Sequence, residues 1–190
     1  MAVATASLVS TIAAFTAHAQ QQAPATDQAA AELQRKTARF APTELKADLS
    51  ALPANEREAL AHIVRAAQVM DALFLRQVWS GNESMLYSLA KDESPLGKAR
   101  LHAFLVNKGP WSRLDHNEPF IPGAPAKPES ANFYPEGATK AEVEKWINAL
   151  SPADKTVATG FFTTIRRGPD GTFIAVPYST EYQGELAIAA

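Results

Sequence analysis

The side chains that most often carry metal-dependent or nucleophilic catalysis are few in this sequence. Its 190 residues include no cysteine, which excludes disulfides, a thiol nucleophile and a Cys-ligated zinc site. After the first twenty residues the histidines are His62, His102 and His116, and no two have the i, i+4 spacing that lets two imidazoles on one helical face bind a metal. His116 has the best surroundings, because Asp115 and Glu118 are close in sequence. We nevertheless interpret all three as structural or surface histidines.

Other patterns of active-site residues are missing as well. There is no Gly-x-Ser-x-Gly elbow and no phosphate-binding loop, and the carboxylates are too scattered to select a general acid and base. Arg166 and Arg167 could bind an anion at the end of a predicted strand, but a solvated pair is the simpler interpretation. The sequence therefore predicts no catalytic residue, no metal ligand and no cofactor bound by this chain.

The segment with the best case for a binding role is KGPWSRLDHNEPFIPGAPAKPESANFYP, residues 108–135. Its aromatic and aliphatic side chains argue against a flexible linker, because burial of each is worth roughly 1.5–3 kcal/mol. We predict an ordered, extended loop that either wraps the helices or faces a substrate, with a domain linker as the remaining alternative. Its candidate residues are Trp111, Arg113, Asp115, Asn132 and Tyr134. Within it we expect Arg113 to pair with Asp115 and to stack on Trp111.

Helical periodicity predicts the elements that must position this loop. Helices are expected over residues 27–38, 56–79, 94–107 and 139–150, with short helices around 85–89 and after 151. The helix over 94–107 should start with Ser94 as cap and Pro95 in its first turn, and its expected buried residues are Leu96, Ala99, Phe104 and Leu105. The helix over 139–150 has an apolar side formed by Val143, Trp146, Ile147 and Leu150. The long helix repeats apolar residues at three- and four-residue steps, and we expect this face to be buried: Leu60, Ile63, Val64, Ala67, Met70, Phe74 and Val78. Leu73 and Leu75 widen that face. Capping boxes are predicted at Asn55 with Glu58 and at Thr139 with Glu142.

The pattern changes near the C-terminus from helical to strand-like. Residues 161–166 and 172–176 are rich in aromatic and β-branched side chains and flank the turn signal Gly-Pro-Asp-Gly, which predicts a hairpin. Tyr178, Tyr182, Leu186 and Ala190 then begin an amphipathic helix that stops without a cap. We therefore expect the N-terminal part of a longer protein, with this stripe exposed. The predicted fold class is mainly α with a small β-hairpin (α+β).

The first residues indicate export. Residues 1–19 are apolar and small and end in Ala17-His18-Ala19, which fits signal-peptidase cleavage before Gln20, although Lys and Arg are missing from their start. The alternative is a disordered Ala-rich tail. We predict a signal peptide over 1–19, a polar leader and short helix over 20–38, and the main region over 39–190. The protein would be periplasmic or secreted, with no membrane contact after cleavage. A net charge of −2 gives no reason to expect nucleic acid.

Three short segments carry a family resemblance: Ser94-Pro95-Leu96-Gly97, the run from Asn107 to Asp115, and Asn132-Phe133-Tyr134-Pro135. They resemble bacterial members of the dipeptidyl peptidase III family, which are zinc-dependent metallopeptidases. The resemblance implies the helical portion of a two-lobed fold with a wide cleft, a peptide substrate, and release of dipeptides from peptide N-termini. It also implies a zinc ion held by a His-Glu-x-x-x-His motif and a later glutamate.

No His-Glu dipeptide occurs in this sequence, so none of the family's catalytic residues can be assigned to it. The chain is thus expected to be the noncatalytic N-terminal portion, with zinc, peptide and a missing C-terminal region belonging to the full-length parent. Related plant proteins join such a region to a Nudix domain, but no Nudix box is present here. Two alternatives stay open: a complete exported helical binding module that uses the Trp111–Tyr134 loop, and a small hydrolase with an unrecognised site.

Overall fold

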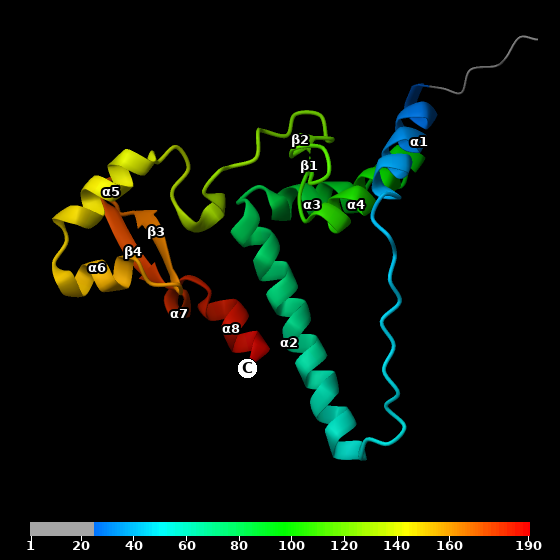
Figure 1. The fold of residues 1–190 in the computed structure, drawn as a ribbon, viewed down its shortest axis with the longest axis horizontal. Coiled ribbons are helices and arrows are strands. Elements are labelled where there is room, and N and C mark those ends of the chain that lie inside the picture. Colours follow the sequence, from blue (N-terminus) through cyan, green and yellow to red (C-terminus); the bar gives the residue numbers. More distant parts are fainter. Residues whose placement is uncertain (1–24) are drawn as a thin grey trace, which may run out of the picture.

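The computed structural model describes residues 25–190, and it is mainly helical with two small antiparallel strand pairs (Figure 1). The elements in chain order are α1 (Ala25–Thr37), α2 (Ala54–Val78), α3 (Asn82–Ala90), α4 (Pro95–Asn107), β1 (Trp111–Ser112), β2 (Glu118–Pro119), η1 (Ala131–Phe133), α5 (Lys140–Ala149), α6 (Pro152–Ala158), β3 (Thr163–Arg167), β4 (Phe173–Pro177), α7 (Tyr178–Glu181) and α8 (Gln183–Ala189). The predicted α+β class is confirmed. The predicted signal peptide, residues 1–19, lies outside the described residues.

One packing unit is built by α1, α3 and α4 with the β1–β2 pair. α4 begins as predicted: Ser94 Oγ accepts a hydrogen bond from the Gly97 amide at 3.0 Å, and Pro95 occupies the first turn. The helix ends at Lys108, whose φ of 58° is left-handed. Its buried face contacts α1, α2 and α3 through two small clusters: Ala30, Leu33, Ala99 and Ala103, and Leu75, Leu89 and Phe104. Leu105, which we expected to be buried, is exposed.

A second unit contains the hairpin and the short helices around it. β3 and β4 pair from Thr163 opposite Pro177 to Arg167 opposite Phe173, close to the predicted strands. The turn relies on Gly171, whose φ of 81° favours glycine. Inside the unit, Trp146 of α5 meets Phe173 edge to face at 5.7 Å. Phe161 and Phe162, which we placed in the strand, precede β3 and are exposed.

The long helix α2 lies between the two units and projects well beyond them (Figure 1). Only Leu73 and Leu75 among its 25 residues are buried, and both are in its C-terminal part. The predicted buried face is therefore wrong for this chain, because Ile63, Val64 and Phe74 are exposed. The predicted capping box at Asn55 is also wrong: Pro53 is the N-cap residue and no side chain caps the helix.

The predicted C-terminal helix is interrupted, because Tyr182 leaves helical geometry between α7 and α8 with φ −118°. α8 then packs against α2. Tyr182 is only 1% exposed, so the expected exposed stripe of Tyr178, Tyr182 and Leu186 is wrong for Tyr182. Among the described helices, none combines the length and the apolar character needed to cross a bilayer.

Candidate functional site

A cavity of about 650 Å³ lies between the end of α2, the segment 128–139 and α5. Its wall is formed by aromatic and aliphatic side chains with a few polar groups, including Trp79, Asn132, Tyr134, Lys140, Val143, Glu144 and Ile147. A concave, largely apolar pocket with few polar groups is the usual form of a binding site for a small molecule or a peptide side chain. We define this feature as the α5 cavity.

One wall of the α5 cavity is a helical face whose start is fixed by local hydrogen bonds. Lys140, Val143, Glu144 and Ile147 follow the i, i+3, i+4, i+7 pattern, so they share one side of α5. The capping box predicted at Thr139 is confirmed: its hydroxyl accepts from the Glu142 amide at 3.2 Å, and the Glu142 carboxylate accepts from the Thr139 amide at 2.9 Å. The Thr139 hydroxyl also donates to the Glu142 carboxylate at 3.0 Å, and the two donors, amide and hydroxyl, lower the pKa of Glu142.

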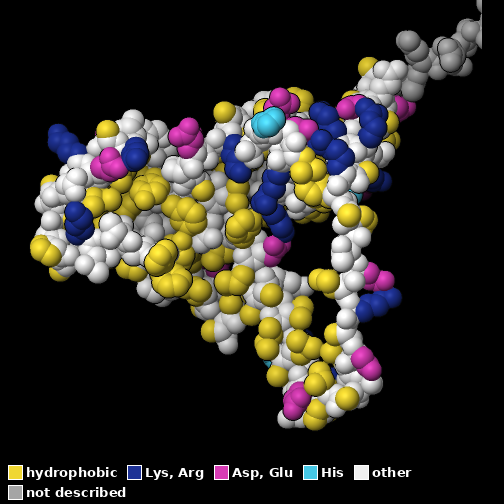
Figure 2. Space-filling view, in the orientation of Figure 1, with side chains coloured by type: hydrophobic (Ala, Val, Ile, Leu, Met, Phe, Trp, Pro, Cys, Tyr) yellow, Lys and Arg dark blue, Asp and Glu magenta, His cyan; other side chains and the backbone are white. Residues whose placement is uncertain are grey.

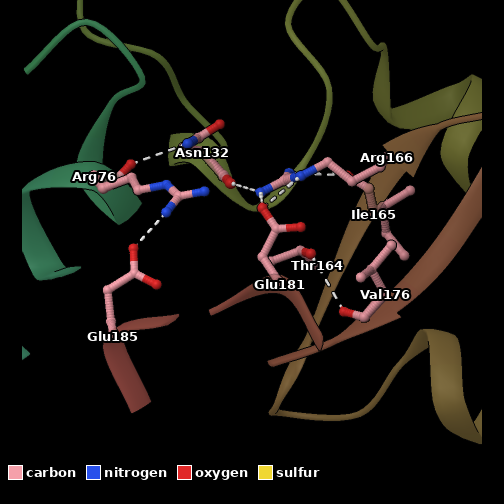
Figure 3. Close-up of polar contacts among 8 residues, drawn as sticks. All are labelled: Arg76, Asn132, Thr164, Ile165, Arg166, Val176, Glu181 and Glu185. Carbon is pink, nitrogen blue, oxygen red and sulfur yellow. Dashed lines mark hydrogen bonds and ion pairs between the residues drawn. The ribbon is translucent and has the colours of Figure 1, made fainter. Parts of the chain in front are cut away.

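The opposite wall is positioned by Asn132, one of the residues selected from the sequence (Figure 3). Its side-chain amide donates to the main-chain carbonyl of Arg76 at 3.0 Å, and its own carbonyl accepts from the Arg166 guanidinium at 3.1 Å. Asn132 thereby joins η1 to both α2 and β3. Tyr134 lies two residues later and lines the same cavity.

Two ion pairs extend this connection to the C-terminal helices (Figure 3). The Arg166 guanidinium donates twice to Glu181, at 3.0 and 2.7 Å, and both side chains are largely buried. The Arg76 guanidinium donates to Glu185 at 2.5 Å and lies 5.6 Å from the centre of the Tyr182 ring. Burial raises the pKa of Tyr182, so its hydroxyl stays protonated. The result is a polar cluster that holds α2, η1, β3, α7 and α8 together.

Trp111 is buried by a different set of neighbours. Its indole nitrogen donates to the Pro125 carbonyl at 2.8 Å, and its ring meets Trp79 edge to face at 5.4 Å. Arg113 does not stack on it as predicted; its amide and side chain donate to Asn107, at 3.0 and 3.2 Å. Trp111 and Arg113 line a separate cavity of about 300 Å³. This part of the loop is an ordered wrapping segment, one of the two roles that the sequence favoured.

Asp115 pairs with Arg39 rather than with Arg113, which corrects the predicted ion pair. The Arg39 guanidinium donates to both carboxylate oxygens, one of them at 2.9 Å, and the Ser112 hydroxyl donates at 2.6 Å. These donors hold the pKa of Asp115 at about 2. The contact ties the end of α1 to the β1–β2 turn. The structure therefore brings Asn132 and Tyr134 together at the α5 cavity and places Trp111, Arg113 and Asp115 elsewhere.

Several residues that line the α5 cavity were not predicted from the sequence to be site residues. Val143 and Ile147 were recognised only as the apolar side of a helix, and Trp79 only as the end of the long helix. The spacing of Val143 and Ile147 identifies one face of α5, but no local sequence pattern indicates that Trp79 lines the same cavity as that face. His62, His102 and His116 are all exposed, and within residues 25–190 no group of three or more His, Asp and Glu side chains is placed to bind a metal ion.

Known proteins similar to this chain are solved dipeptidyl-peptidase III structures. The chain matches dipeptidyl-peptidase III from Corallococcus sp. strain EGB with 62% identity and a TM-score of 0.82, over 84% of this chain and 30% of that one. It matches DPP III from Caldithrix abyssi with 42% identity and a TM-score of 0.77, over 82% of this chain and 29% of that one. The chain is similar to part of a dipeptidyl-peptidase III. This confirms the resemblance read from residues 94–97, 107–115 and 132–135.

A curated relative outside the bacteria carries a different name. Nudix hydrolase 3 from Arabidopsis thaliana is 37% identical over 165 residues, which cover 71% of this chain but 21% of that protein. No protein-family model matches the sequence. The chain thus spans less than a third of the length of each dipeptidyl-peptidase III or Nudix-named protein it matches.

Proposed function

We propose that this chain is the noncatalytic portion of a zinc-dependent peptidase of the dipeptidyl-peptidase III type. The observation that carries the proposal is the 62% identity over 84% of the chain to a solved dipeptidyl-peptidase III. The metal and its ligands belong, in this proposal, to the part of the protein outside this chain, because the described residues do not fit a zinc site. The substrate is a peptide, which loses a dipeptide from its N-terminus.

The chain's own contribution is to bind and orient that peptide. The α5 cavity offers an apolar wall from Trp79, Tyr134 and Ile147, where a peptide side chain can leave water. Asn132 supports this wall through its bonds to Arg76 and Arg166, so the wall is held before the peptide arrives. In such an enzyme, positioning of the peptide contributes to the rate without direct contact with the metal.

The test is a chimera, in which this chain replaces the matching segment of the Corallococcus sp. enzyme, assayed for dipeptide release. We expect the chimera to retain activity within about tenfold of that enzyme, and the isolated chain to have none. Ile147→Asp should raise KM in the chimera by about tenfold, because it places a charge in the apolar wall. Glu136→Gln, a change at an exposed rim position of the cavity, is the matched control. A folded but inactive chimera, or chelator-sensitive dipeptide release by the isolated chain, would contradict the proposal.

Export is part of the proposal, and it rests on the Ala17-His18-Ala19 pattern. The test is N-terminal sequencing of the protein recovered from the periplasm or medium of a Gram-negative host. A mature N-terminus at Gln20 is expected. Protein that stays in the cytoplasm with residues 1–19 attached would contradict export.

The alternative of a complete binding module makes a different prediction for the isolated chain. A module that acts alone should bury its large apolar side chains, melt cooperatively and take up no 8-anilinonaphthalene-sulfonate. The exposure of Ile63, Phe161 and Ile188 favours the first proposal instead. We expect the dye to bind the isolated chain and to bind the chimera much less.

A further inference from the structure

The long helix α2, whose N-terminal half projects from the two packing units, presents an apolar face that the described part of the chain leaves exposed. Ile63 is 65% exposed, and Val64, Met70 and Phe74 are exposed as well. Ile63 and Met70 are seven residues apart and Met70 and Phe74 are four apart, so these three share one side of the helix, and Val64 extends that side next to Ile63. Figure 2 shows hydrophobic side chains along the projecting half of α2. We call these four residues the α2 stripe.

The contacts that α2 makes with α8 use its other side. Arg76, which bonds Glu185 of α8, is two residues beyond Phe74, and side chains two apart point to nearly opposite sides of a helix. Leu73 is the buried residue nearest to that side. The packing of α8 therefore neither covers nor competes for the α2 stripe.

An exposed helix with such a face is unfavourable by itself. Isolated helices are marginal in water, and most helical stability in proteins comes from packing of the apolar face. The stripe is also not a lone surface residue, because Phe161 before β3 and Ile188 of α8 add further exposed apolar side chains. A partner that covers these elements would remove all of this surface from water.

We infer that the α2 stripe is the docking surface for the remainder of the dipeptidyl-peptidase III chain, meaning the protein outside the matched segment. The inference rests on the proposed function. The solved relative supplies the necessary length, because this chain covers 30% of it. A second copy of this chain is the less suitable occupant: a two-fold dimer pairs one patch with itself, whereas the exposed apolar residues here lie on several elements.

The test introduces one cysteine. Because this chain has no cysteine of its own, the introduced thiol is the only one in it. Ile63→Cys reports on the stripe, and Arg65→Cys, two residues away on the other side of α2, is the matched control. Each variant is made in the isolated chain and in the chimera with the Corallococcus sp. enzyme. The rate of modification by N-ethylmaleimide is measured at the introduced site by peptide mass spectrometry. Helix content by circular dichroism verifies that each variant is folded.

We expect the Ile63→Cys rate to fall by about tenfold or more from the isolated chain to the chimera, because a buried thiol reacts only after local opening. The Arg65→Cys rate should fall clearly less. An equal Ile63→Cys rate in chain and chimera would overturn the inference, even if the chimera released dipeptides. Protection in a folded but inactive chimera would support the inference while refuting the proposed function. Protection in the isolated chain that grows with its concentration would assign the stripe to a second copy and overturn the inference.

Discussion

α4 and α2 both carry apolar residues at helical spacing, but the structure uses the two faces differently. α4 buries Ala99, Ala103 and Phe104 against α1, α3 and the C-terminal part of α2 within this chain. α2 leaves the α2 stripe in water and buries only Leu73 and Leu75. The periodic pattern indicates that a face is made for burial, but it contains no information about which part of the protein covers it. An exposed periodic face such as that of α2 therefore indicates a partner outside the described residues.

The largest expected difference in stability between the two helices comes from truncating one side chain in each. Phe104→Ala should lower the free energy of unfolding of this chain by about 3–5 kcal/mol, because Phe104 is 0% exposed and leaves a cavity. Ile63→Ala should change it by less than about 0.5 kcal/mol, because the side chain is mostly in water. Urea unfolding followed by circular dichroism measures both. Equal losses for the two variants would show that α2 already buries its stripe in the isolated chain.

The second largest effect is expected at the polar cluster that joins α2 to the hairpin and the C-terminal helices. Arg166→Ala removes the donor to Glu181 and to the Asn132 carbonyl, and it should cost about 2 kcal/mol because charged, partly buried hydrogen bonds are lost. It should also speed amide hydrogen exchange in residues 131–134, where Asn132 loses its anchor. Arg167→Ala is the control: its contacts with Glu142 at 3.9 Å, with the Gly171 carbonyl at 3.1 Å and with the Phe173 ring at 4.5 Å are made by an exposed side chain, so the cost should stay below about 1 kcal/mol. Equal costs would remove the special role of Arg166.

Local signals predicted most of the elements, and they did so through identifiable residues. Ser94-Pro95 marked the start of α4, Thr139 and Glu142 marked α5, and the turn ending in Gly171 marked the hairpin. Each of these signals acts within a few residues of chain. The β1–β2 pair was not predicted, because strands of two residues have no periodicity to detect.

The contacts that build the candidate site could not be predicted in the same way. Arg39 and Asp115 are 76 residues apart in sequence, and Asn132 and Arg76 are 56 apart. Nothing in the local pattern distinguishes Arg39 from Arg113 as the partner of Asp115. The sequence grouped Asn132 and Tyr134 with Trp111, Arg113 and Asp115, whereas only the first two line the α5 cavity. Which helices line the α5 cavity depends on tertiary packing, and local sequence patterns contain no information about that packing.

A smaller effect separates the two capping boxes that the sequence predicted. Thr139→Ala should destabilise the chain by about 1 kcal/mol, because the Glu142 amide loses its side-chain acceptor. Asn55→Ala should be neutral within about 0.5 kcal/mol, because no side chain caps α2. Thermal unfolding of both variants under one condition gives the comparison. A larger loss for Asn55→Ala would mean that α2 is capped in solution in a way that the structure does not show.

The smallest expected effect is the acid dependence of the tie between α1 and the β1–β2 turn. Arg39 and Ser112 hold the pKa of Asp115 at about 2, below the ordinary value of 3.8. A carboxylate with a lowered folded-state pKa stabilises the fold above its unfolded pKa, and this contribution is lost as the pH falls toward 2. Asp115→Asn should therefore show a shallower loss of stability between pH 3.8 and 2 than the unmodified chain.

Two measurements identify Asp115 as the group responsible for that difference. The NMR titration of its side-chain carboxyl should have a midpoint near 2, and Arg39→Ala should move this midpoint upward because the main donor is removed. Added salt should reduce the difference between the two variants, since the pair is partly exposed. A midpoint near 3.8 in the unmodified chain would mean that Arg39 does not hold Asp115 in solution. The packing of α1 on α4 would then rest on its apolar contacts alone, through Ala30 and Leu33.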